Sequence, residues 1–96
     1  MKYSVIVTDA LDNVATAIQN LAQGDTIQLD PANKNSVIKL EETVPQGFKI
    51  ALQNIRRGES IIKYGEVIGL ATTPIKQGQC VHIHNVEGLK GRGDKL

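Results

Sequence analysis

The sequence predicts a compact all-β fold of barrel-like or clip-like shape, and three observations support this class. The chain has 96 residues, which fits one small domain. A pattern of apolar residue, two residues, glycine, two residues and apolar residue occurs four times, at 21–27, 44–50, 55–61 and 75–81. A glycine in this setting is typical of a tight turn with a positive φ. The segments between the turns are rich in Val, Ile and Thr, as strands are.

The predicted strands lie between these turns. In chain order they cover residues 3–8, 26–29, 36–40, 48–52, 60–63, 67–72 and 79–83. Segment 12–21 fits two structures. A cap at Asp12 followed by apolar residues at helical spacing favours a helix. Val14, Thr16 and Ile18 instead fit one face of a strand. Because this segment runs into the first glycine turn as the other strands do, we expect a strand or a mixed turn.

The turns and strands predict one domain over residues 1–87. Residues 88–96 contain three Gly and three Lys or Arg, and this composition predicts a flexible tail.

Composition narrows the classes of function. Eleven Lys and Arg stand against ten Asp and Glu, for a net charge of +1, and only 3% of residues are aromatic. We therefore expect no nucleic-acid partner, because such a surface is basic and interleaved with aromatic rings. No apolar run approaches the ~20 residues of a membrane span, so we expect no membrane contact. A single cysteine and the lack of a leader pattern predict a cytoplasmic location.

A row of polar side chains follows the predicted strand 79–83. Cys80, His82 and His84 are two residues apart, which on a strand places them on one face while the apolar residues between them face the core. Two imidazoles at this spacing are candidate ligands of a transition metal. An edge strand with two solvated histidines has the same pattern. Further ligands would come from a partner, because the chain has no other His or Cys.

A second polar group, Lys63, Tyr64 and Gly65, interrupts two apolar strands. A hairpin turn is the simple interpretation. The functional interpretation uses Lys63 to hold a carboxylate or to act as a base, and the Tyr64 hydroxyl to donate a hydrogen bond or relay a proton. A third group, Asp12 and Asn13, is typical of a turn or a cap.

Four segments occur together in a distinctive order. They are Asp-Asn-Val-Ala at 12–15, Pro-Gln-Gly-Phe-Lys-Ile-Ala-Leu at 45–52, Ile-Lys-Tyr-Gly-Glu-Val-Ile-Gly at 62–69 and Val-His-Ile-His-Asn at 81–85. Together they resemble the N-terminal SAF domain of the altronate and galactarate dehydratase family, over residues 3–94. The chain is also similar to the separately encoded small subunits of such enzymes.

The resemblance implies a small β-clip fold and a hydro-lyase in two parts. The chain would help a large C-terminal dehydratase subunit to eliminate water from a sugar acid such as altronate, giving a 2-keto-3-deoxy acid. It also implies a divalent metal, iron, held mainly by that partner. We expect the chain to be inactive without the large subunit, and to self-associate through an uncovered apolar patch when isolated.

The chemistry of this elimination needs a base, a cation and an acid, and the chain offers candidates for each. The residues expected to take part in catalysis are His82, His84, Lys63 and Tyr64. The residues expected to bind substrate are Asn85, Gly65, Asp12 and Asn13. His82 and His84 are also expected as metal ligands shared with the partner.

Two positions depart from the family pattern. Where family members carry Gly-His-Lys, this chain has Gly47, Phe48 and Lys49, so we assign no catalytic role to Phe48. Cys80 stands where relatives have a bulky residue, and this favours a role for His82 and His84 without the Cys80 thiol. Two alternatives stay open. One is the small subunit of a sulfolactate sulfo-lyase, which eliminates sulfite instead of water. The other is a non-catalytic module that binds a carbohydrate acid or a protein.

Overall fold

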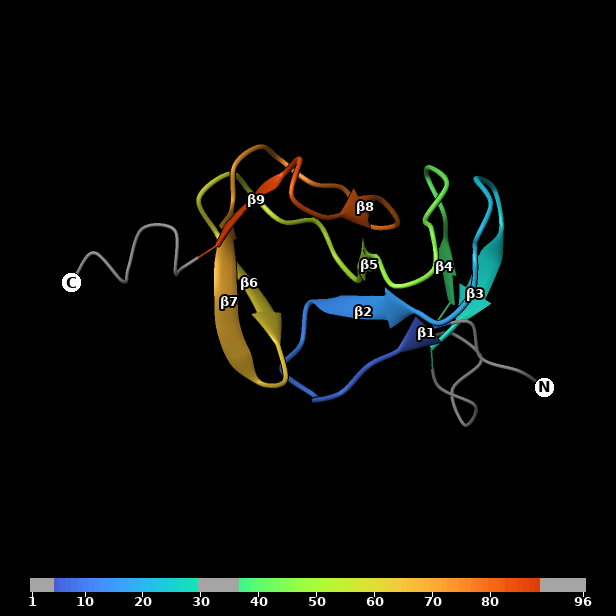
Figure 1. The fold of residues 1–96 in the computed structure, drawn as a ribbon, viewed down its shortest axis with the longest axis horizontal. Coiled ribbons are helices and arrows are strands. Elements are labelled where there is room, and N and C mark those ends of the chain that lie inside the picture. The colour runs from blue at the N-terminus through green and yellow to red at the C-terminus, as the bar shows by residue number, and fades with distance from the viewer. Residues whose placement is uncertain (1–4, 30–36, 89–96) are drawn as a thin grey trace.

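The computed structural model describes residues 5–29 and 37–88, and these residues form only short antiparallel strands, turns and loops (Figure 1). The strands are β1 (Val5–Ile6), β2 (Val14–Ala17), β3 (Thr26–Gln28), β4 (Val37–Lys39), β5 (Lys49–Ala51), β6 (Ser60–Lys63), β7 (Glu66–Ala71), β8 (Cys80–Val81) and β9 (Val86–Gly88). The predicted all-β class is confirmed. Segment 12–21 contains the strand β2, so the strand interpretation of that segment is also confirmed.

Three sheets make up the fold. The central sheet has the order β1-β2-β5-β8, and it is flanked by the β3-β4 pair at one end of the molecule and by the β6-β7-β9 sheet at the other (Figure 1). All pairs are antiparallel. Within the described residues no helix is long and apolar enough to cross a membrane.

The four glycine turns are confirmed. Gly24, Gly47, Gly58 and Gly78 have φ angles of 90°, 88°, 87° and 91°. In each turn the residue after the glycine donates its N–H to the carbonyl three residues earlier, at 2.9–3.0 Å. This combination is typical of a type II turn, which needs a positive φ at its third residue. The repeated sequence pattern is therefore a repeated backbone structure.

The two faces of the central sheet cover two separate hydrophobic cores. Side chains alternate between faces along a strand. Ala15, Ala17 and Ile50 therefore join the first core, which extends to β3 and β4, whereas Val14 and Ala51 join the second core, which extends to β6 and β7. An isolated bridge ties two turns together in each core. It joins Leu21 to Val44 in the first core and Ile55 to Ile75 in the second.

The strand predicted over residues 79–83 is shorter in the structure. β8 ends at Val81, and a turn follows before β9 begins at Val86. The strand β9 was not predicted, because only one of its three residues favours strands. It forms by pairing with β7, through Ala71 and Val86, Leu70 and Glu87, and Gly69 and Gly88. The predicted tail lies outside the described residues except for Gly88.

Candidate functional site

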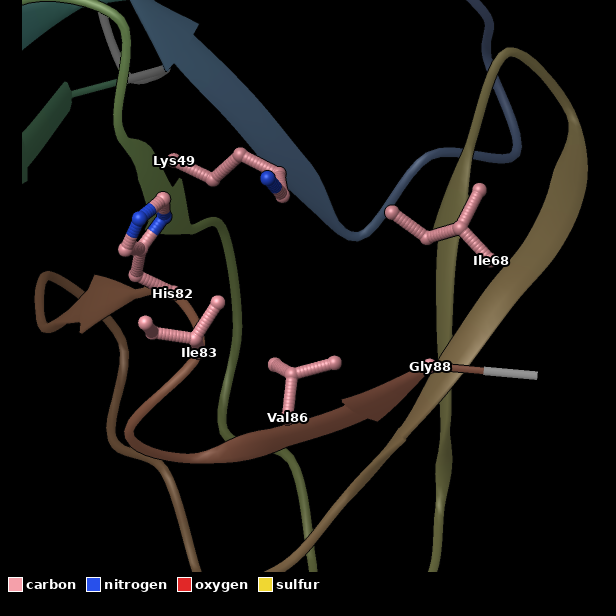
Figure 2. A pocket seen from close by; sticks show the side chains of 6 residues that line it. All are labelled: Lys49, Ile68, His82, Ile83, Val86 and Gly88. Atoms are coloured by element: carbon pink, nitrogen blue, oxygen red, sulfur yellow. The ribbon is translucent and has the colours of Figure 1, made fainter. Parts of the chain in front are cut away.

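A hollow of about 210 Å³ opens between the central sheet and the β6-β7-β9 sheet (Figure 2). Its lining comes from β5, β7, β9 and the turn after β8, through Lys49, Ile68, His82, Ile83, Val86 and Gly88. Figure 2 shows the Lys49 side chain extending from β5 toward the side formed by β7. The hollow therefore combines apolar walls with two nitrogen groups, the Lys49 ammonium and the His82 imidazole. This pairing of a mostly apolar surface with a few polar groups is typical of small-molecule sites.

Strand register places His82 beside Phe48. Lys49 pairs with Val81 across β5 and β8, so the next residues outward, Phe48 and His82, stand opposite each other. Their rings stack with centroids 3.8 Å apart and planes inclined by 22°. Stacking fixes the plane of the imidazole and leaves it half-buried at the hollow.

Asn85 turns the chain after β8. Its buried side chain accepts a hydrogen bond from the His82 N–H at 3.0 Å and donates one to the Cys80 carbonyl at 2.9 Å. The Asn85 N–H also donates to the His82 carbonyl at 3.0 Å. The predicted alternation of three side chains on one strand face is therefore wrong. Cys80 is buried, whereas Ile83, which was expected to face the core, is 84% exposed.

Lys49 is half-buried and lines the hollow. Burial, followed by the positive charge of nearby Lys63, lowers the pKa of Lys49, and the Cys80 thiol opposes this shift. Across the β2-β5 pair Lys49 stands opposite Thr16, whose buried Oγ1 has no hydrogen-bond partner among the described residues. A cation in such surroundings favours a bound anion, because the anion restores the interactions that the ammonium has lost with water.

The β6-β7 hairpin carries the predicted group of Lys63, Tyr64 and Gly65. Tyr64 and Gly65 have φ angles of 59° and 72°, and Lys63 pairs with Glu66 across them, as in a two-residue type I′ turn. The hairpin interpretation is thus confirmed. The Tyr64 side chain is 63% exposed, and the Lys63 Nζ lies 4.9 Å from the centroid of its ring. Both side chains of the predicted pair are thus near each other at the tip.

The Asp12 carboxylate holds the backbone of this hairpin tip. Its carboxylate accepts hydrogen bonds from the Gly65 N–H at 2.8 Å and from the Thr8 hydroxyl at 2.6 Å. The Thr8 Oγ1 in turn accepts a hydrogen bond from the Tyr64 N–H at 3.3 Å. Burial raises the pKa of Asp12, but the hydrogen bonds from Thr8, Gly65 and Tyr64 outweigh it, so the pKa lies below its usual value.

Asn13 fastens the same hairpin further along β6. Its side chain donates to the Ser60 carbonyl at 2.8 Å and accepts from the Ile62 N–H at 2.7 Å. Its backbone exchanges further bonds with Ile62 and Leu52. The polar groups of Asn13 and Asp12 are therefore engaged in holding β6 and its turn against β2. Any contact of these two residues with substrate stays a prediction.

The predicted site residues fall into separate places. His82 lines the hollow, whereas His84 is exposed on the following turn. Cys80 belongs to the first core and donates its N–H to the Glu42 carboxylate at 2.8 Å. Burial, and then the charge of Glu42, raise the pKa of its thiol. Cys80 is thus unsuited to acting as a thiolate ligand beside the two histidines.

The described residues do not form a metal centre by themselves. Within 5–29 and 37–88, no group of three or more His, Cys, Asp or Glu side chains lies close enough together to hold an ion. A structural site for a metal usually needs four protein ligands and a catalytic one three. The histidines of this chain fit only a site to which another polypeptide or region supplies most of the donors, and that role stays a prediction.

Lys49 was not among the residues predicted for the site. Its position follows from the long-range pairing of β5 with β2 and β8, and the local turn that Asn85 makes completes the hollow beside it. The only local signal was that Lys49 shares one face of the predicted strand 48–52 with the apolar residue Ala51. A charged residue that the strand pattern carries toward the protein interior is a candidate for a binding role.

Comparison with known proteins identifies relatives of this chain. The altronate/galactarate dehydratase SAF domain family matches residues 3–89. The chain is 43% identical over 76 residues to altronate dehydratase of Escherichia coli K12, which covers 79% of the chain and 14% of that protein. It is 34% identical to altronate dehydratase of Bacillus subtilis, with the same coverage. The matched chain thus spans 14% of the length of these two relatives.

A third relative is close to this chain in length. The chain is 29% identical over 90 residues to the (2R)-sulfolactate sulfo-lyase subunit alpha of Chromohalobacter salexigens. That match covers 91% of the chain and 96% of the subunit.

Proposed function

We propose that this chain, which belongs to the altronate/galactarate dehydratase SAF domain family, is the SAF unit of a lyase that eliminates water from a hydroxylated sugar acid. The remainder of the enzyme would be a large dehydratase region on a partner subunit. The similarity of the chain to altronate dehydratases supports the class of reaction. The match covers 14% of the length of those enzymes, which supports the need for a further region.

The observation that carries the proposal is the hollow with Lys49 and His82. Elimination next to a carboxylate begins when a base removes the proton from the carbon that bears the carboxylate. The electron pair of that C–H bond forms a C=C bond to the next carbon as the C–O bond of the hydroxyl on that next carbon breaks. An acid protonates the departing oxygen to give water, and the enol product rearranges to the 2-keto acid.

The two nitrogen groups fit two parts of this reaction. Lys49 is a cation that holds the carboxylate and stabilises the negative charge that develops on it as the proton leaves. His82 exchanges a proton with a reacting group, because an imidazole carries one nitrogen that donates a proton and one that accepts it. The ring is held in one plane by Phe48, which limits the reorientation needed for proton transfer. In this proposal iron or another divalent ion belongs mainly to the large partner.

A second candidate is the small subunit of a sulfolactate sulfo-lyase. The match to a sulfo-lyase subunit alpha over 96% of that subunit favours it. The reaction would differ only in the leaving group, because a C–S bond would break and sulfite would depart with the electron pair. The same carboxylate anchor and proton-transfer group serve both reactions.

The test is reconstitution. The chain is purified alone and together with the large dehydratase region of its own organism, and each sample is assayed with altronate, galactarate and (2R)-sulfolactate. We expect activity only in the mixture. The substitutions His82→Ala and Lys49→Met should each lower kcat/KM by roughly 100-fold or more, since general acid-base and charge-stabilising groups are worth that much. Lys39→Met, on β4 and exposed, is the matched control.

The outcomes separate the alternatives. Rates within about threefold of wild type for both His82→Ala and Lys49→Met would overturn the proposed roles. Turnover of sulfolactate alone would select the sulfo-lyase. Ligand binding without turnover in any mixture would point to a non-catalytic binding module.

A further inference from the structure

A nearly fully exposed isoleucine stands at the edge of the hollow. Ile83 lines the hollow and is 84% exposed, the largest exposed fraction of any large apolar side chain among the described residues. Figure 2 shows it next to His82, with Val86 further along the same segment. Single exposed apolar residues are common on protein surfaces, so the significance of Ile83 depends on how firmly the fold holds it there.

The turn that carries Ile83 is held by Asn85. The Asn85 side chain bonds to the His82 N–H and the Cys80 carbonyl, and its own N–H bonds to the His82 carbonyl, all at 2.9–3.0 Å. Asn85 is only 5% exposed, so these hydrogen bonds are shielded from water. The backbone at Ile83 therefore cannot turn inward without breaking them, and the fold keeps this side chain presented to solvent.

A second exposed isoleucine lies on the face of the central sheet from which the hollow opens. Lys49 of the hollow stands opposite Thr16 on β2, which in turn stands opposite Ile6 on β1. This face carries the second core, since Thr16 lies two residues from Val14. Val14 is fully buried in that core, whereas Ile6 is 49% exposed. Ile6 lies two strand spacings from Lys49, or about 10 Å.

The relatives indicate what covers this face. The altronate dehydratases of Escherichia coli and Bacillus subtilis match the chain over only 14% of their length, so most of each enzyme is a further region. A relative of nearly the same length as this chain is the alpha subunit of a sulfo-lyase. Firmly held apolar side chains beside a polar site are the anchors that interfaces use.

We infer that the large dehydratase region docks on this face, with Ile83 inserted into an apolar pocket of that region and Ile6 at the edge of the contact. Docking there encloses the hollow between the two proteins. It excludes water from Lys49 and His82, which strengthens their electrostatic action on a bound acid. This inference rests on the proposed function, because it names the partner face of the same site.

The experiment measures binding of the two proteins without substrate. The full chain of 96 residues is titrated calorimetrically with the large dehydratase region of its own organism. Ile83→Ser should weaken the complex by roughly 10- to 100-fold, as expected for one large apolar side chain transferred from water into a pocket. The loss should be the same at about 0.1 M and 1 M salt, because an apolar contact is not screened. Ile6→Ser should have a smaller effect, about threefold to tenfold.

Two further variants make the test specific. Ile83→Leu keeps an apolar side chain of the same volume and should retain the wild-type affinity within about threefold. Val37→Ser removes an exposed apolar side chain from β4, at the opposite end of the molecule, and is the matched control (Figure 1). It should leave the dissociation constant unchanged. Thermal unfolding of Ile83→Ser should match wild type, because the replaced side chain is exposed, and shows that the variant is folded.

Four results would overturn the inference. They are an unchanged affinity in Ile83→Ser, an equal loss in Val37→Ser, no complex up to roughly 100 μM, and a dimer of the chain that depends on Ile83 and persists when the large region is added. The last result, read by sedimentation, would assign the face to a second copy.

The outcome is separate from that of the reconstitution assay. A complex that depends on Ile83 but turns over none of the acids would keep this inference and overturn the proposed function. An active mixture whose affinity does not depend on Ile83 would do the reverse.

Discussion

Two glycines with the same backbone conformation stand in different surroundings. Gly24 and Gly78 have φ angles of 90° and 91°. A Cβ atom on Gly24 would meet nothing within 4 Å, whereas one on Gly78 would lie 2.3 Å from the Lys39 carbonyl oxygen. The first position needs glycine for its dihedral angle alone. The second needs it also because the backbone at the end of β4 passes against it.

This contrast predicts different costs for the same substitution. Gly24→Ala should lower the free energy of unfolding by about 1–2 kcal/mol, the cost of a left-handed residue. Gly78→Ala adds a backbone clash and should lower it by roughly 2–5 kcal/mol. Urea denaturation of the two variants measures the difference. Equal losses would show that the contact with Lys39 has no energetic weight.

Asp12 is the residue whose ionisation the hairpin requires. Its folded pKa lies below the usual value, so the contribution of Asp12 to stability is present above its unfolded pKa near 3.8 and is lost as the pH falls through the lower folded pKa. Asp12→Asn should therefore be less stable than wild type at pH 7 and show a smaller loss of stability between about pH 5 and pH 2. Its Gly65 amide should exchange roughly tenfold faster with deuterium. Parallel pH profiles for both proteins would contradict this account.

In three of the four glycine turns, the residue after the glycine has a side chain that accepts a hydrogen bond within the turn, and in the fourth turn it does not. Asp25, Glu59 and Gln79 each accept a hydrogen bond from the N–H of the residue three positions earlier. In the remaining turn that earlier residue is Pro45, which has no N–H, and the acceptor position holds Phe48. The absence of a donor at Pro45 thus frees Phe48 to stack on His82.

The turn comparison predicts that proline is accepted at the equivalent position of another turn. Ala22→Pro should change the free energy of unfolding by no more than about 1 kcal/mol, because Pro45 occupies the same place. Asp25→Ala should cost about 1 kcal/mol in the wild-type chain and almost nothing when Ala22 is proline. A double-mutant cycle in urea measures the coupling. Additive effects of the two substitutions would show that the Asp25 carboxylate acts through some other group.

The fold as a whole keeps Lys49 half-buried, and this burial of a charged group lowers the stability of the folded state. Because the folded pKa of Lys49 is lowered, the folded state binds a proton there less readily than the unfolded chain does, and stability rises as the pH increases through that folded pKa. After allowance for screening of a half-exposed group, Lys49→Met should raise the thermal midpoint by roughly 2–5 °C. The same substitution should abolish anion binding. Lys39→Met should change neither quantity, and a lower midpoint for Lys49→Met would contradict a binding role gained at the expense of stability.

The sequence allowed prediction of features that depend on local chemistry. The positive-φ glycines, the all-β class and the hairpin around Tyr64 and Gly65 belong to this group, because a few neighbouring residues determine them. Two features were not predicted. Strand propensity at 79–83 favoured extension, whereas the Asn85 side chain makes a local turn there through its hydrogen bonds to His82 and Cys80. Lys49 reaches the hollow through the long-range pairing of three strands, which local patterns do not contain.

The two isolated bridges also bear on how the chain reaches its fold. The bridges Leu21–Val44 and Ile55–Ile75 each close a loop of about 20 residues, and they belong to different cores. Neither loop overlaps the other in sequence, so either core can begin to assemble before the other. The central sheet takes β1, β2 and β5 from the first part of the chain and β8 from the later part, so it closes only when both parts have met. We therefore expect the pairing of β5 with β8, which brings Phe48 to His82, to form after both bridges have closed, and the hollow to form with it.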